Sequence, residues 1–120
     1  MDKFQAAFEI LYIASGIDGV VDERELEIIL RFIKSNEENL AFDPIEISED
    51  IDLLNRDGVI EEFIKVSNLY NDLSSAKEKR ILIDFLLELI AADGDIDEDE
   101  IVLLMILSKN LNIDLDKYLK

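Results

Sequence analysis

Apolar residues recur along most of the chain at intervals of three and four positions, the spacing that places them on one face of an α-helix. In the first segment, for example, Phe4, Phe8 and Leu11 form one such stripe. We expect helices over approximately residues 3–18, 22–36, 48–54, 59–70, 75–92, 98–111 and 114–119. The pattern therefore predicts an all-α protein, a compact helical bundle of about six to seven helices.

Polar residues at several predicted helix starts support these boundaries. Asp22 is followed three positions later by Glu25, which is a variant of the capping box, and Ser75 is followed by Glu78 in the same way. In a capping box, the side chain of each partner accepts a hydrogen bond from the backbone N–H of the other. Both pairs therefore indicate that a helix begins at the residue after Asp22 and after Ser75.

The middle of the chain is predicted to connect two helical units. The only proline, Pro44, lies in the segment 39–47, which we interpret as a loop. Ser48 is expected to cap a short helix, and the pair Asp57 and Gly58 is expected to end it.

Two further predictions concern the side chains that the helices bury. The segment from Ile81 to Ala92 is apolar on nearly all sides, so its helix should be the central, most buried element. The second helix is expected to bury four aliphatic residues, Leu26, Ile29, Leu30 and Ile33.

The chain contains two acidic corners of related sequence. In residues 18–25 and again in residues 93–100, an Asp-Gly pair is followed by Asp-Glu-x-Glu at the same offsets. We interpret this as an internal duplication of a helix–corner–helix unit, covering about residues 3–36 and 76–111, with residues 37–75 as the connector. At 120 residues, the chain is expected to form one domain over 1–120.

Composition narrows the chemistry. The chain has no cysteine and no histidine, which excludes disulfides and thiolate catalysis and argues against zinc and copper sites. Its four scattered glycines form no phosphate-binding loop. Carboxylate oxygen, the ligand of Ca²⁺ and Mg²⁺, is abundant instead.

The net charge of −17 indicates which partners the chain attracts. Nucleic acids and anionic membrane surfaces should be repelled, whereas divalent cations and basic proteins should be attracted. The longest apolar run, Ile101–Leu107, is too short to span a membrane, and the start of the chain does not resemble a signal peptide. We therefore expect a soluble, cytoplasmic protein without membrane insertion.

Helix capping explains part of both acidic corners. Asp22 and Asp97 occupy predicted N-cap positions, each of which contributes about 1 kcal/mol. Glu25 and Glu100 occupy the third position of the following helix, where the helix dipole favours a negative charge. These residues therefore have a structural role to fill even without a ligand.

Capping does not explain the first aspartate of each corner. Asp18 and Asp93 lie at the C-terminal end of a predicted helix, where the helix dipole disfavours a carboxylate. A bound divalent cation would offset the repulsion among neighbouring acids. The candidate metal ligands are Asp18, Asp22, Glu25, Asp93, Asp95, Asp97 and Glu100.

The second corner does not match the calcium loop of an EF-hand. If Asp93 is loop position 1, Glu98 stands where that loop requires glycine, and Leu104 stands where it requires the bidentate glutamate. We expect a short, open corner to bind Ca²⁺ or Mg²⁺ weakly, with a dissociation constant of about 10⁻⁴–10⁻³ M.

The second corner resembles the signature of the TerB-like domain family. Residues 91–100 read Ala-Ala-Asp-Gly-Asp-Ile-Asp-Glu-Asp-Glu between two apolar helices, and the first corner matches the same pattern less fully, with Ile17 where alanine is usual. The family includes the tellurite-resistance protein TerB and the N-terminal region of a membrane-anchored J-domain co-chaperone. The resemblance implies an all-helical fold and an acidic, cation-binding surface, with a role in a stress or tellurite-resistance-type response.

Two functions therefore remain open from the sequence. The chain is either a cation-binding module or an interaction module whose acidic face binds a basic protein partner, in which case the corners only cap helices. We do not expect an enzyme, because the acids lie on polar turns without the apolar surroundings that shift pKa values for acid–base catalysis.

Overall fold

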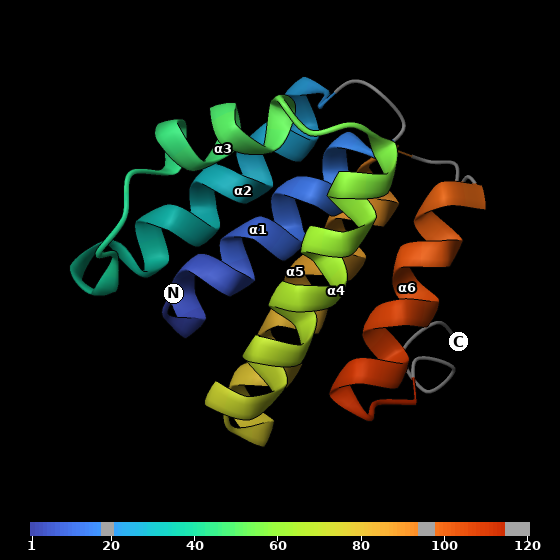
Figure 1. The fold of residues 1–120 in the computed structure, drawn as a ribbon. Helices are drawn as coiled ribbons and strands as arrows, with labels where there is room; N and C mark the ends of the chain where they lie inside the picture. The colour runs from blue at the N-terminus through green and yellow to red at the C-terminus, as the bar shows by residue number, and fades with distance from the viewer. Residues whose placement is uncertain (18–20, 94–97, 115–120) are drawn as a thin grey trace.

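The computed structural model describes residues 1–17, 21–93 and 98–114, and this part of the chain forms six α-helices and no strand (Figure 1). The prediction of an all-α bundle is therefore confirmed. In chain order the elements are α1 (Lys3–Gly16), α2 (Glu23–Ser35), the 3₁₀ turn η1 (Glu37–Asn39), α3 (Pro44–Asp52), α4 (Arg56–Leu73), α5 (Ala76–Asp93) and α6 (Glu98–Leu111).

The central element is α1, which contacts α2, α3, α4 and α5. Its buried side chains face several directions around the helix and are Ala6, Ala7, Phe8, Glu9, Ile10, Leu11, Ile13 and Ser15. The prediction that the helix ending near Ala92 forms the centre is wrong, because α5 packs on α1 and α2 and exposes its outer side. On that outer side Ile81 and Glu88 are exposed.

Only one narrow face of α2 is buried. Ile29 and Phe32 lie in the core, whereas Leu26 and Leu30 are 46% and 54% exposed. The prediction that Leu26 and Leu30 are buried is therefore wrong. The reason is that α2 makes its main contacts with α5 and α1, and these contacts leave Leu26 and Leu30 exposed.

The connector begins its helix earlier than the sequence suggested. Pro44 is the first residue of α3, where its missing N–H is not needed, and the Asp43 side chain accepts a hydrogen bond of 3.0 Å from the backbone N–H of Ile45. Ser48 is inside the helix and donates to the carbonyl oxygen of Ile45. The predicted loop over 39–47 is therefore wrong in its second half.

The start of α4 also differs from the prediction. The Asn55 side chain caps it by accepting a hydrogen bond of 2.7 Å from the backbone N–H of Gly58. Asp57 and Gly58 consequently lie in the first turn of a helix that they were expected to precede.

Other boundaries agree with the sequence. Ser75 and Glu78 form the predicted capping box at the start of α5, with hydrogen bonds of 2.9 and 3.2 Å. The helix predicted over 98–111 is α6. The short helix predicted from Asp114 onward lies almost entirely outside the described residues. Within the described ranges, none of the helices has the length and apolar character needed to cross a membrane.

The predicted units correspond to α1–α2 and α5–α6. In the bundle α2 lies beside α5, while α6 packs on α4, where Nδ2 of Asn110 donates a hydrogen bond of 2.7 Å to Oγ of the buried Ser67. This arrangement brings the starts of α2, α4 and α6 to the same end of the molecule (Figure 1). The internal duplication itself stays a prediction.

Candidate functional site

The first acidic corner ends in a complete capping box at the start of α2. The Asp22 side chain accepts a hydrogen bond of 2.9 Å from the backbone N–H of Glu25, and the backbone N–H of Asp22 donates one of 3.2 Å to the Glu25 side chain. This confirms the capping predicted for both residues. Glu25 is only 5% exposed, so the box turns its carboxylate toward the inside of the bundle.

The second corner places a glutamate at the equivalent position of α6. Glu100 lies in the first turn of that helix and is only 7% exposed. The neighbouring residue Glu98 is exposed. Of the three acids in this turn, Glu100 is thus the one that enters the protein interior.

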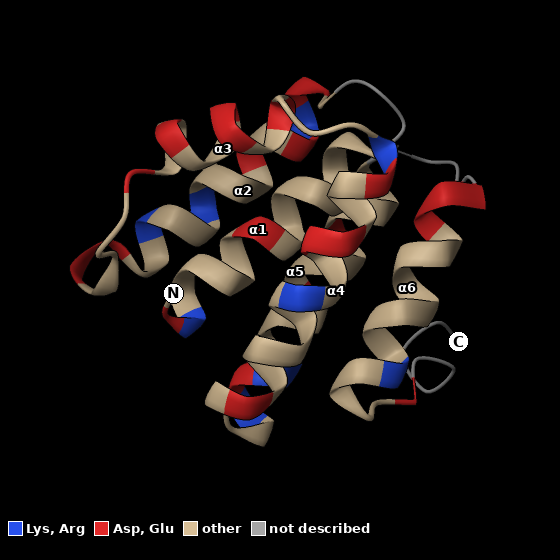
Figure 2. Ribbon diagram, in the orientation of Figure 1, with Lys and Arg blue, Asp and Glu red and all other residues tan. Residues whose placement is uncertain are grey.

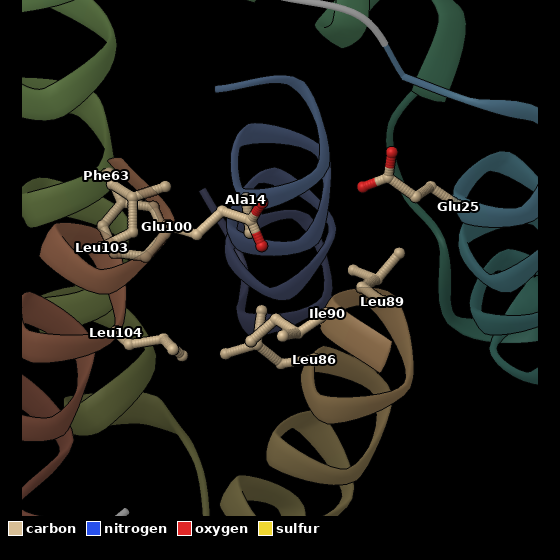
Figure 3. Close-up of a pocket in the computed structure, with 9 residues that line it drawn as sticks. All are labelled: Ala14, Glu25, Phe63, Leu86, Leu89, Ile90, Glu100, Leu103 and Leu104. Atoms are coloured by element: carbon tan, nitrogen blue, oxygen red, sulfur yellow. The ribbon is translucent and has the colours of Figure 1, made fainter. Parts of the chain in front are cut away.

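Glu25 and Glu100 line the same pocket. They approach it from different helices, and in the view of Figure 3 both carboxylates point toward the end of α1 that carries Ala14. The space open to the centre of a water molecule is about 10 Å³, enough for about one water molecule or one ion. The rest of the lining is apolar and comprises Phe63, Leu86, Leu89, Ile90, Leu103 and Leu104.

A basic residue also reaches the second corner. Arg56, at the start of α4, forms an ion pair with Asp99 in the first turn of α6. Within this pair the Arg56 guanidinium donates a hydrogen bond to the Asp99 carboxylate. The hydrogen bond, together with the positive charge of Arg56, lowers the pKa of Asp99 below its ordinary value. Asp99 therefore has a protein partner, and Arg56 ties the start of α4 to the corner. Sequence reasoning did not identify Arg56, because only the packing of α4 on α6 places it there.

The described residues include only part of the predicted ligand set. Asp22, Glu25 and Glu100 are placed, whereas Asp18, Asp95 and Asp97 and the side chain of Asp93 lie outside the description. Within the described part of the chain, no three acidic side chains come close enough together to hold a metal ion. Of the described ligand candidates, Glu25 and Glu100 line one pocket.

Charge on the molecule's surface is uneven. Figure 2 shows acidic residues along α3 and at the starts of α2, α4 and α6, whereas the body of α6 is largely uncharged. The first turns of α2 and α6, which carry the pocket glutamates, each contain at least two acids.

Sequence reasoning treated the two corners as separate clusters and did not predict their shared pocket. The available signal was the equivalent position of Glu25 and Glu100, each three residues after a predicted N-cap. That equivalence gives the side chains the same local direction, but only the tertiary structure shows that they line one pocket.

Comparison with known proteins agrees with the fold and with the corner motif. Residues 4–118 match the family model described as tellurite resistance protein TerB. Comparisons with curated proteins and with solved structures gave no match. The matched segment contains both acidic corners and the six described helices, apart from the first residue of α1. The resemblance seen in the sequence is confirmed, and the chain belongs to the TerB family.

Proposed function

We propose that this chain is a non-enzymatic module that binds a divalent cation, Ca²⁺ or Mg²⁺, through its acidic corners. The observation that carries the proposal is the convergence of two buried glutamates, Glu25 and Glu100, on one pocket from the starts of two helices. Divalent hard cations bind through oxygen ligands, and an opposite charge nearby favours the ionised form of a carboxylate. The donor set therefore suits such an ion.

The corners themselves would supply the other ligands. We assign to the site the carboxylates Asp18, Asp22, Glu25, Asp93, Asp95, Asp97 and Glu100. Capping and coordination are compatible, because an ionised carboxylate has two oxygens and about four lone-pair directions. Without the twelve-residue loop of an EF-hand, we expect a dissociation constant of about 10⁻⁴–10⁻³ M.

The size of this pocket suits an ion better than an organic substrate. Pockets for small-molecule substrates usually measure about 300–1,000 Å³. The space between Glu25 and Glu100 takes about one water molecule, so no organic substrate fits beside these carboxylates.

A second candidate function is favoured by the capping box of Asp22 and Glu25. Since this box gives both residues a structural role, the corners could serve only to start helices. In that case the acidic face of the protein would bind a basic protein partner. By its family, the chain also fits a role in tellurite tolerance, which is tested by comparing cells with and without it on tellurite.

The experiment that separates the two functions is amide NMR during titration with CaCl₂ and MgCl₂ at constant ionic strength. Cation binding predicts saturable shifts confined to the amides of the two corners and the first turns of α2 and α6. Titration with NaCl over the same ionic strength is the control, since screening acts on all exposed charges. Equal shifts with NaCl would contradict the cation site and favour the basic partner.

Matched variants make the test specific to the pocket. Glu100→Gln and Glu98→Gln each remove one negative charge from the first turn of α6, but only Glu100 lines the pocket. We expect Glu100→Gln to weaken calcium binding several-fold and Glu98→Gln to leave it almost unchanged. Equal effects of the two variants would show that only the local charge matters.

A further inference from the structure

A second buried carboxyl group lies away from the corners, where α1 packs on α4. Glu9 is only 2% exposed. Its Oε2 accepts a hydrogen bond of 3.2 Å from Nε2 of Gln5, one turn earlier on α1. Glu9 and Glu62 of α4 line the same pocket, close enough for their carboxyl groups to share a hydrogen bond. Glutamate is rarely buried to this degree unless it is paired, and here its partner is another acid.

A hydrogen bond between two carboxyl groups requires one proton, because an ionised carboxylate has no hydrogen to donate. Burial, followed by the hydrogen bond with Glu62 and the negative charge of Glu62, raises the pKa of Glu9 from its ordinary value of 4.5 to about 8. Nζ of Lys65 lies 3.6 Å from Oε1 of Glu62, and its positive charge lowers the pKa of Glu9 by less than burial and Glu62 raise it. We therefore assign the shared proton to Glu9 at neutral pH.

The pair borders an open pocket, so protons can reach it without unfolding of the bundle. The pocket has a volume of about 240 Å³ and lies between α1, α3 and the start of the chain. The charged groups that line it besides the pair are the exposed Asp50 of α3 and Met1, which carries the terminal amine. The rest of the lining is Gln5, Ile47, Ile51 and Leu54.

We propose that Glu9 and Glu62 form a proton-dependent latch between α1 and α4, which is closed while they share a proton and loosens when alkaline solution removes it. Loss of the proton leaves two negative charges in contact within a largely apolar interface, and this arrangement is unfavourable. Because α1 is the central helix, loss of the proton would weaken the packing of α1 on α3 and α4. The latch does not depend on the proposed cation site.

The direction of the pH dependence follows from the raised pKa. Below pH 4.5, Glu9 is protonated in both the folded and the unfolded chain, and the latch makes its full contribution to stability. Between 4.5 and about 8 the folded chain keeps a proton that the unfolded chain releases, so stability falls as the pH rises. Above about 8 both states have lost the proton, and this contribution no longer changes.

The first test measures the proton on the full-length chain directly. Carbon-13 NMR of the glutamate carboxyl groups, with Glu9 assigned by the signal that Glu9→Gln removes, should show Glu9 titrating near pH 8. Over the same range, hydrogen-exchange protection of amides in the middle of α1 should fall. A Glu9 carboxyl group that titrates near 4.5, as an exposed glutamate does, would overturn the proposal.

The second test uses two variants with the same loss of charge. Glu9→Gln keeps the shape of the protonated side chain and its hydrogen-bonding capacity, whereas Glu61→Gln changes an exposed neighbour of Glu62. Between about pH 6 and about pH 9 the melting temperature of the wild type and of Glu61→Gln should fall, and that of Glu9→Gln should stay nearly constant. An equal fall in all three proteins would contradict the latch. If Glu9→Gln fails to fold, the exchange data and the pH at which the buried carboxyl signal of the wild type titrates decide the question.

Discussion

At the scale of single residues, the same side chains can both start a helix and face the candidate site. Asp22 and Glu25 cap α2 through two reciprocal hydrogen bonds, while the Glu25 carboxylate also lines the inner pocket. The cap fixes the side-chain direction before any ligand arrives. Preorganisation of this kind lowers the entropy lost when an ion binds.

Asp22→Ala should therefore destabilise the protein by about 1 kcal/mol, because the backbone N–H of Glu25 loses its acceptor. Urea denaturation in metal-free buffer measures this loss. Glu27→Ala, an exposed position farther along α2, is the control and should change stability by less than about 0.5 kcal/mol. If the two variants lose equal stability, the Asp22 cap does not contribute measurably to the stability of α2.

The local sequence predicts residues such as Asp22 and Ser75 well, because a cap is decided within four positions of the chain. It did not predict that Glu25 and Glu100 line one pocket, or that Glu9 pairs with Glu62, because these residues lie on helices that are distant in sequence. Burial of a carboxyl group is difficult to predict from sequence, since the pattern of apolar and polar residues does not distinguish a buried glutamate from an exposed one.

At the scale of helices, sequence reasoning identified elements more reliably than their faces. It placed α6 over residues 98–111 and recognised the starts of α2 and α5. It misjudged α3 by interpreting Pro44 as part of a loop, although proline is favoured at the first position of a helix. It also predicted too many buried residues on α2. Periodicity shows that a helix has an apolar face, but it does not show how much of that face a neighbouring helix covers.

The apolar run Ile101–Leu107 in α6 shows this limit and gives an element-scale prediction. Leu107 is fully buried, whereas Met105 on the outer side is 67% exposed. Leu107→Ala should cost about 2–5 kcal/mol, since it opens a cavity in the core. Met105→Ala should change stability by less than about 0.5 kcal/mol.

Thermal or urea denaturation of both variants measures the difference. Since both substitutions shorten a side chain to alanine on one helix, the effect of helix propensity is similar in the two. A cost for Met105→Ala as large as that for Leu107→Ala would mean that the outer side of α6 is covered in solution, for example by a second copy of the chain.

At the scale of the whole molecule, the charge of −17 opposes compaction wherever acids gather. Figure 2 shows acids at the starts of α2, α4 and α6 and also along α1, α3 and α4, and the ion pair of Arg56 with Asp99 offsets this charge only locally. Any cation stabilises such a protein to some extent by screening. A specific site must therefore stabilise it beyond what ionic strength alone provides.

Ten millimolar Ca²⁺ acting on a site with a millimolar dissociation constant should raise the free energy of unfolding by about 1.4 kcal/mol. The measurement is urea denaturation in CaCl₂ compared with NaCl at the same ionic strength. The double variant Glu25→Gln with Glu100→Gln should lose most of the calcium-specific gain, because both pocket carboxylates are replaced. The double variant Glu23→Gln with Glu98→Gln removes the same charge from exposed positions in the same two helix turns and should keep the gain. If NaCl stabilises the wild type as much as CaCl₂ does, the protein responds to screening alone, and the corners are helix caps on an acidic interaction module.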